Sequence, residues 1–181
     1  MAQNQYMQVK DILSKAIQLK KNNKYTEAKK LLRETLDAYP DNRYIKASLA
    51  DTLSRTGELE EALQLSDEVL NQKPGDSRAL TVKGNVYFNK RDYDKALEFF
   101  EQARVNNDSN YLISRLIRTH IKLEEYDEAL NICQKKLDEE PDNTSFQKLM
   151  GSIYEKKGET EIAAQYYDKY LDENPDDEFA Y

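Results

Sequence analysis

Cysteine, glycine, proline and tryptophan are scarce in this chain: its 181 residues include one Cys, five Gly, four Pro and no Trp. The lone Cys133 excludes an internal disulfide, so the fold does not depend on an oxidising compartment. One His and one Cys are too few for a structural zinc site with four ligands, and five scattered glycines do not form a phosphate-binding loop. With few turn formers and 34% charged residues, the composition favours helices over strands.

Long apolar runs are absent as well. No stretch approaches the roughly 18 residues that a membrane-spanning helix needs, and Met1 to Lys10 is too polar for a secretory signal. We therefore expect a cytoplasmic protein with no membrane insertion. A chain from which a signal peptide had been removed would show the same composition.

A repeat of 33 or 34 residues is the strongest positive feature of the sequence. It is marked by five evenly spaced alanines, Ala28, Ala62, Ala96, Ala129 and Ala163. Four of them have a Tyr or Leu three residues earlier, and four have a Pro twelve residues later. The apolar residues before each alanine recur with the helical period, and the proline ends the helix that contains the alanine. Each unit is therefore predicted to be two helices.

Small residues also recur twelve positions before these alanines, as Ala16, Ala50, Gly84 and Gly151, with Ile117 as the exception. Two helices of a hairpin approach closely where one of them presents a small side chain. A single hairpin would leave half of its apolar surface in water, so the hairpins are expected to stack on one another.

This pattern closely resembles the tetratricopeptide repeat family, and the resemblance covers Val9 to Asp177. It implies an all-α, right-handed superhelical solenoid of antiparallel helix-turn-helix repeats, forming one array over residues 1–181. The predicted repeats are 9–42, 43–76, 77–109, 110–143 and 144–177.

Several residues depart from the family pattern. Ile117 and Lys136 occupy positions that are usually small, and Lys83 occupies one that is usually apolar. Residues 106–110, where the third repeat meets the fourth, lack the proline and are one residue short, which predicts altered local packing there. The last four residues, 178–181, are expected to open a sixth repeat of a longer protein.

A basic stripe is predicted on the first helix of each repeat. Positions 2, 5, 6, 9, 12 and 13 lie opposite the core positions at about 100° per residue, and the resemblance implies that they face the concave groove where relatives bind peptides. Ten of these thirty residues are Lys or Arg and two are acidic, a formal charge of +8 in a chain of net charge -7. A basic groove in an acidic protein predicts an acidic or amphipathic peptide as the partner.

The predicted peptide-binding residues are Lys10, Tyr44, Arg55, Arg78, Asn85, Phe88, Tyr111, Arg115, Arg118, Lys122, Lys148 and Lys156. Arginine binds a carboxylate with two parallel bonds, so Asn85 together with Tyr111, Arg115, Arg118 and Lys122 is the best local candidate. The competing interpretation is that these cations pair with the chain's own acids or only solvate an exposed face. The carboxylate clamp of chaperone-binding relatives is not predicted, because only Asn85 matches it.

No motif indicates catalysis. His120 and Cys133 fall at core positions of one repeat, so we predict packing roles for them, and we predict no enzyme, no metal and no cofactor. Besides a peptide-binding scaffold, two alternatives remain: a regulatory array within a larger enzyme or signalling protein, and a module that associates end to end through Tyr166, Tyr170 and Leu171. Binding of nucleic acid is disfavoured by the net charge of -7.

Overall fold

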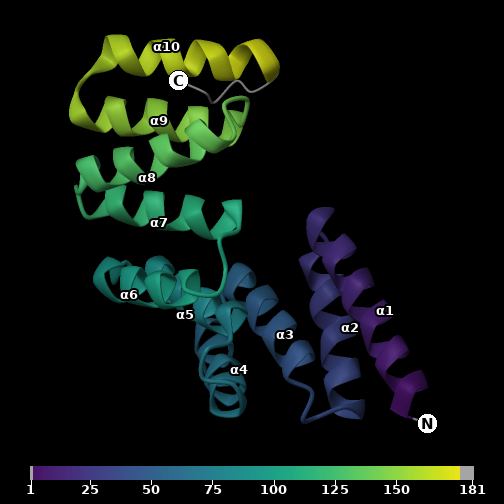
Figure 1. The fold of residues 1–181 in the computed structure, drawn as a ribbon. Helices are drawn as coiled ribbons and strands as arrows, with labels where there is room; N and C mark the ends of the chain where they lie inside the picture. The colour runs from purple at the N-terminus through teal and green to yellow at the C-terminus, as the bar shows by residue number, and fades with distance from the viewer. Residues whose placement is uncertain (1, 176–181) are drawn as a thin grey trace. The chain divides into compact units, whose positions relative to one another are not determined.

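The computed structural model describes residues 2–175, and these residues form ten α-helices and no strand (Figure 1). The all-α helical-repeat class predicted from the sequence is confirmed. In chain order the helices are α1 (Ala2–Lys21), α2 (Tyr25–Ala38), α3 (Arg43–Thr56), α4 (Leu59–Gln72), α5 (Ser77–Asn89), α6 (Tyr93–Arg104), α7 (Asn110–Lys122), α8 (Tyr126–Glu139), α9 (Thr144–Lys157) and α10 (Thr160–Glu173). The predicted opening of a sixth repeat, 178–181, lies outside the described residues.

The helices begin where the repeat pattern places them. Helices α3, α5, α7 and α9 start at the first residue of the predicted second to fifth repeats, and the second helix of every repeat starts three residues before its alanine. Helix α1 differs, because it begins at Ala2, well before the predicted start at Val9. No Gly or Pro interrupts the first 21 residues, so nothing there stops the helix from extending.

Side-chain caps fix the start of the first helix in four of the five repeats. The capping residues are the last residues of the predicted repeats: Asn42, Asp76, Ser109 and Asn143. Asn42 Oδ1, for example, accepts hydrogen bonds from the backbone N–H groups of Tyr44 at 3.1 Å and Ile45 at 3.2 Å. Such caps satisfy N–H groups that have no partner within the helix.

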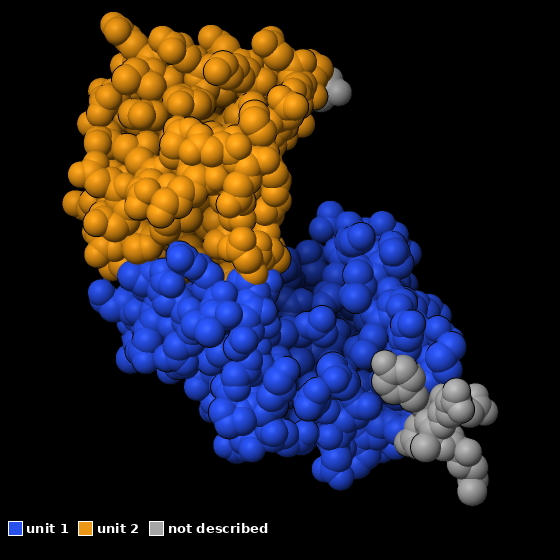
Figure 2. Space-filling model, viewed as in Figure 1, with its two compact units in different colours: residues 1–107 blue, residues 108–181 orange. Residues whose placement is uncertain are grey.

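The helices fall into two compact units, residues 1–107 and residues 108–181, coloured separately in Figure 2. In unit 1, α1 packs on α2, α3 on α4 and α5 on α6, and α3 also contacts both α1 and α5. In unit 2, α7 packs on α8 and α9 on α10, and α9 contacts both α7 and α8. Each unit thus stacks hairpins as the repeat pattern predicts, while a single array over 1–181 stays a prediction.

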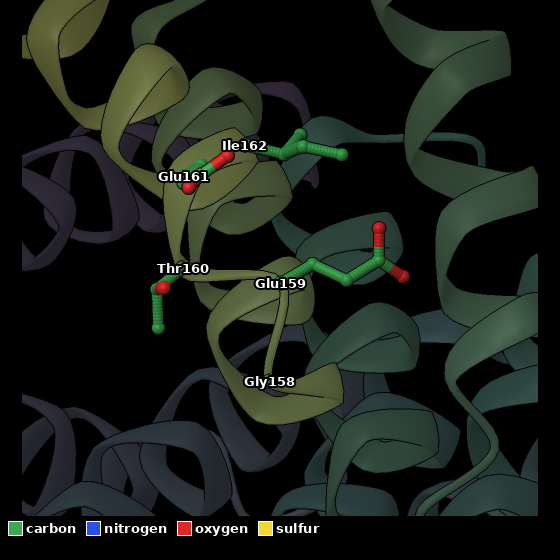
Figure 3. Close-up of a pocket in the computed structure, with 5 residues that line it drawn as sticks. All are labelled: Gly158, Glu159, Thr160, Glu161 and Ile162. Atoms are coloured by element: carbon green, nitrogen blue, oxygen red, sulfur yellow. The ribbon is translucent and has the colours of Figure 1, made fainter.

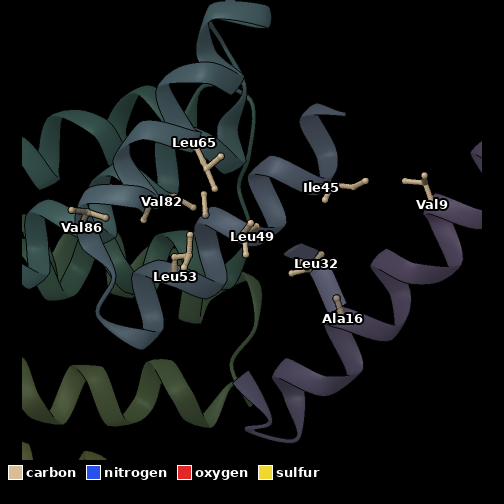
Figure 4. Close-up of a cluster of buried hydrophobic side chains, with 11 residues drawn as sticks. Val9, Ala16, Leu32, Ile45, Leu49, Leu53, Leu65, Val82 and Val86 are labelled. Atoms are coloured by element: carbon tan, nitrogen blue, oxygen red, sulfur yellow. The ribbon is translucent and has the colours of Figure 1, made fainter. Parts of the chain in front are cut away.

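The five repeat alanines are core residues. Four of them are completely buried and Ala163 is 3% exposed. Figure 4 shows how the core of unit 1 is built from several helices, with the small Ala16 of α1 near Leu32 of α2. Labelled there are Val9, Ala16, Leu32, Ile45, Leu49, Leu53, Leu65, Val82 and Val86.

Size matching between the two helices of a hairpin explains the small positions. A Cβ added to Gly84 would lie 2.5 Å from the ring of Phe100, and one added to Gly151 would lie 2.7 Å from the ring of Tyr167. Each glycine therefore makes room for an aromatic ring sixteen residues later. At the same two positions of the fourth repeat the sizes are reversed, with Ile117 and Cys133, and both side chains are fully buried.

Two of the predicted departures from the family pattern contact each other. Lys136, which replaces a small residue, is 8% exposed, and its Nζ lies 2.7 Å from Asp108 Oδ2 and 2.8 Å from Glu139 Oε2. Asp108 stands where four other repeats have proline. Hydrogen bonds to Asp108 and Glu139 raise the pKa of Lys136. The predicted change in packing at the start of the fourth repeat therefore includes an ion pair between two residues that both depart from the pattern.

A left-handed residue closes the turn inside every hairpin, and it yields a stability prediction. Gly57 has φ 92°, and apart from its two neighbours in the chain no residue comes within 4 Å of the place a Cβ would take. Gly57→Ala should therefore lower the free energy of unfolding by about 1 kcal/mol through backbone strain alone. Urea denaturation measures this change. Gly75→Ala is the control, because Gly75 lacks positive φ and its added Cβ would make an ordinary 3.5 Å contact with Asn106. An equal loss in both variants would contradict the explanation.

Candidate functional site

The candidate site in unit 1 is the outward side of α1, α3 and α5. Of the predicted binding residues there, Lys10, Arg55 and Arg78 are exposed and so is the ring of Tyr44. Phe88 is half-buried and packs edge-on against Tyr93, with 5.2 Å between ring centroids. The side chain of Asn85 is only 5% exposed, so this residue belongs largely to the packing between helices.

The exposed part of the stripe is narrower than the sequence predicted. The sequence placed repeat positions 5 and 6 on the outward side, but on α3 and α5 these positions are buried. The residues are Ala47, Ser48, Thr81 and Val82. The reason is that α3 lies against both α1 and α5, so these positions fill the contact between neighbouring first helices. The cations that remain accessible stand at positions 2 and 13 of their repeats.

A hollow of about 400 Å³ opens in unit 1 between the end of α1, the start of α2 and α3. Its lining is Ile17, Lys20, Lys21, Asn23, Tyr25, Asp51 and Arg55. The wall thus combines three cations and one carboxylate with an exposed aliphatic side chain and a tyrosine. Lys20, Lys21 and Asp51 belong to the predicted stripe but not to the predicted binding residues.

Asp51 sits at the centre of the charges in this hollow. Its Oδ2 lies 2.6 Å from Lys20 Nζ, and its Oδ1 lies 3.2 Å from Arg55 Nε. Burial alone would raise the pKa of Asp51, but Lys20 and Arg55 outweigh burial and hold that pKa below its usual value. The carboxylate is therefore ionised at neutral pH and compensates the two cations beside it. The acid four residues before Arg55 on one helix is the sequence signal for this pair.

The candidate site in unit 2 is the outward side of α7 and α9, two helices in contact. Arg118, Lys122 and Lys156 are exposed, as is Tyr111. Arg115 and Lys148 are half-buried.

Two residues of α9 are held by the last helix, α10. Lys148 Nζ lies 4.7 Å from the ring centroid of Tyr170. The acidic residue on this side, Glu155, accepts a hydrogen bond from the Tyr167 hydroxyl at 2.9 Å. Four of the five predicted cluster residues thus share α7, and the predicted association of Asn85 with them spans the two units and stays a prediction.

Six stripe cations form no ion pair with any described residue: Lys10, Lys21, Arg78, Arg118, Lys122 and Lys156. Cations on other faces behave differently. Arg33 binds Glu61 at 2.6 Å and Lys83 binds Asp67 at 2.7 Å. The alternative in which Arg118 and Lys122 pair with the chain's own acids is thus not what the described part of the chain shows.

A second hollow, of about 370 Å³, lies at the turn between α9 and α10. In Figure 3 Glu159 and Ile162 extend to one side of this turn and Thr160 to the other, so the side chains do not converge on a common point. The lining is one continuous segment, Gly158 to Ile162, with two acidic residues and no cation. This hollow therefore lacks a cationic side chain that would hold an anion.

Cys133 and His120 lie in the core, and the polar atoms of both side chains take part in hydrogen bonds. The Cys133 thiol is buried and donates to the carbonyl oxygen of Phe146 at 3.3 Å, and burial raises its pKa to about 12. Nδ1 of His120 lies 2.7 Å from Glu125 Oε2, in a hydrogen bond inside the hairpin turn. Both residues are buried, as predicted. The described residues contain no cluster of His, Cys, Asp and Glu that could hold a metal, and none of their helices is long and apolar enough to cross a membrane.

Comparison with known families matches three overlapping stretches of this chain. Residues 19–86 match the family described as "Tetratricopeptide repeat", and residues 115–177 match "YpiA-like, C-terminal tetratricopeptide repeats". Residues 55–136 match "Anaphase-promoting complex, cyclosome, subunit 3". Human tetratricopeptide repeat protein 21A is 29% identical over 90 residues, 50% of this chain, and its Xenopus laevis relative 21B is 29% identical over 93 residues, 51% of this chain. Each matched segment spans only 7% of the relative's length.

Solved structures share the fold. A thermophilic TPR protein of Thermus thermophilus, TTC0263, has a TM-score of 0.79 at 22% identity, over 93% of this chain and 92% of that one. Pseudomonas aeruginosa PilF has a TM-score of 0.71 at 20% identity, over 90% and 75%. YrrB, described as a TPR protein with an unusual peptide-binding site, has a TM-score of 0.66 at 24% identity, over 82% and 77%. At these identities the likeness establishes the helical-repeat fold alone.

Proposed function

Because the chain belongs to the tetratricopeptide repeat family, whose members are in general protein-interaction scaffolds, we propose that it binds an acidic or amphipathic peptide segment. The proposed contact surface is the set of exposed cations on its first helices. The observation that carries the proposal is that six of these cations have no ion pair with any described residue. A peptide-binding site is also what YrrB, of the same fold, is described as having.

The physical basis of the proposed binding is the positive charge of these six cations, which no described acidic side chain compensates. Exposed Lys and Arg side chains attract an approaching acidic segment even when the whole protein is acidic, because the local field of the stripe acts at short range. Contacts between these cations and carboxylates are charge-assisted hydrogen bonds, the stronger kind. Tyr44 and Tyr111 add exposed aromatic surface, which favours an acidic segment that also carries apolar residues.

The other roles considered from the sequence have less support. We propose no catalytic role, because the thiol and imidazole are buried. For end-to-end association, Tyr166 and Tyr170 are half-buried in α10, and the cations of Lys169 and Lys148 lie over their rings. That face is therefore partly covered by lysine side chains, and self-association stays a prediction.

Peptide selection by charge tests the proposal. The wild-type chain should bind peptides rich in Asp and Glu, and replacing each Glu by Gln in the same peptide should weaken binding at least about tenfold. Raising the salt concentration should weaken binding of the acidic peptide and leave the Gln peptide unchanged. Fluorescence anisotropy of labelled peptides measures both. Equal affinity for the Glu and Gln peptides would show that the stripe's charge does not select the ligand.

A further inference from the structure

The two units carry opposite arrangements of charge at the same two repeat positions, the ninth and the thirteenth. In the second repeat these positions hold Asp51 and Arg55, whose side chains form an ion pair at 3.2 Å. In the fourth repeat they hold Arg118 and Lys122. No other repeat has a cation at both positions, since the remaining pairs are Ile17 and Lys21, Asn85 and Asn89, and Ser152 and Lys156.

The pair on α7 is unfavourable for the helix itself. Residues four apart on a helix are neighbours, with about 5–6 Å between their Cβ atoms, and like charges at this spacing destabilise the helix. The position of Lys122 in the last turn of α7 suits the helix dipole, but Arg118 lies a full turn earlier and gains little from it. Neither side chain forms an ion pair with a described residue. An anion supplied from outside the described chain would relieve this repulsion.

The hollow of unit 1 shows what such an anion does. There the chain supplies the carboxylate itself, and Asp51 uses both oxygens to bind Lys20 and Arg55. The Lys20 and Asp51 side chains are 16% and 18% exposed, so this arrangement is well shielded from water. A ligand carboxylate entering the hollow would have to displace Asp51. The fold already holds Asp51 in place, whereas the ligand would lose conformational and translational freedom on binding.

We infer that Arg118 and Lys122 are the anchor for two carboxylates of the acidic segment, and that Asp51 is a built-in carboxylate that keeps the equivalent place in unit 1 from binding one. This inference rests on the proposed function and assigns it to unit 2. The spacing of the ligand's acids is inferred from the helix, in which Arg118 and Lys122 have Cβ atoms about 5–6 Å apart with long, flexible side chains beyond them. In an extended peptide, side chains two residues apart point the same way and lie about 7 Å apart. The preferred segment is therefore Glu-x-Glu or Asp-x-Asp, with one residue between the acids.

Two double variants test the assignment, each removing two exposed stripe cations that have no ion pair with a described residue. Arg118→Gln with Lys122→Gln should weaken binding of a labelled Glu-x-Glu peptide at least about tenfold in an anisotropy titration. Lys10→Gln with Arg78→Gln removes the same charge from the unit 1 part of the stripe. A stripe that binds the peptide along its whole length would then lose as much affinity, whereas the assignment to unit 2 predicts a change of less than about twofold. All four residues are exposed, so both variants should fold, which circular dichroism checks.

Moving the internal carboxylate tests the role of Asp51. Arg118→Asp places an acid four residues before Lys122, as in the second repeat, and should abolish peptide binding while leaving thermal stability equal or slightly raised. Asp51→Asn should restore binding in the chain that also carries Arg118→Gln and Lys122→Gln, because it releases Lys20 and Arg55. If the Asp51→Asn variant does not fold, the Arg118→Asp variant alone still tests the assignment.

The outcomes separate the inference from the proposed function. Equal loss in the unit 1 and unit 2 double variants, or loss in unit 1 alone, would overturn the assignment to Arg118 and Lys122 while leaving acidic-peptide binding in place. Retained binding by Arg118→Asp would overturn it as well. If the wild-type chain binds Glu-x-Glu no better than Gln-x-Gln, the proposed function itself fails.

Discussion

Phe100→Ala should lower the free energy of unfolding by about 4 kcal/mol. Phe100 lies in α6, is completely buried, and rests directly on Gly84 of α5. Removing the ring leaves a cavity that the surroundings fill poorly, because Gly84 has no side chain to close it. Urea denaturation followed by far-UV circular dichroism measures the loss. Val105→Ala is the control, because Val105 caps the end of the same helix and is 80% exposed. This change should alter the free energy of unfolding by less than about 0.5 kcal/mol.

The reciprocal change makes the explanation testable as a pair. Gly84→Ala alone should destabilise by about 1–3 kcal/mol, because the new Cβ would lie 2.5 Å from Phe100 Cδ1. In the chain that already carries Phe100→Ala, the same change should be neutral or stabilising, since the methyl group then enters the cavity. Additive losses in the double variant would mean that the two positions do not share one packing site.

The repeat pattern predicts this packing because its signal is local and regular. The alanines, the aromatic or leucine that opens four of the five second helices, and the proline that follows four of them all lie within one hairpin. Helix starts such as Arg43 and Tyr126 can therefore be predicted from spacing. The size relation between Gly84 and Phe100 also stays inside one repeat. At Ile117 and Cys133 the larger side chain stands on the first helix and the smaller on the second, whereas Ala50 and Ser66 of the second repeat are both small, so the size relation differs from repeat to repeat.

Features that depend on particular side chains are harder to predict. The ion pair of Lys136 with Asp108 joins two departures from the pattern, and spacing alone gives no reason for an acid and a base to meet there. The burial of Thr81 and Val82 follows from how closely neighbouring first helices pack, which helical periodicity does not specify. Helical periodicity assigns each residue a direction, whereas burial depends on what lies in that direction.

The same distinction applies to the candidate site. Arg118 and Lys122 could be predicted as exposed cations because repeat position alone places them outward. That Asp51 compensates Lys20 and Arg55 could not be predicted fully, because Lys20 belongs to the preceding repeat. Counting charges along the stripe gives both units the same formal charge. The count does not show that the acid of unit 1, Asp51, contacts two of the cations, whereas Glu155 of unit 2 accepts a hydrogen bond from Tyr167.

Asp51→Ala should lower the free energy of unfolding by about 2 kcal/mol near neutral pH, since it removes the shared partner of two cations. Lys20 and Arg55 remain partly accessible to water, which keeps the loss below that of a fully buried pair. Asp67→Ala is the matched control. It removes a carboxylate that binds a single lysine, Lys83, at 2.7 Å but is 55% exposed, so its loss should be about 0.5 kcal/mol.

The pH dependence identifies the cause of that loss. Lys20 and Arg55 hold the pKa of Asp51 in the folded chain below its ordinary value of 3.8, despite the opposing effect of burial. The unfolded chain therefore binds the proton more tightly, and the carboxylate's contribution is fully present above about pH 4 and is lost as the pH falls through the lower folded pKa. The stability difference between wild type and Asp51→Ala should accordingly be constant from about pH 7 to about pH 5 and shrink below about pH 4. A difference that does not shrink in acid would mean that Asp51 stabilises the hollow through packing rather than through its charge, and would remove the reason to regard it as an internal substitute for a ligand carboxylate.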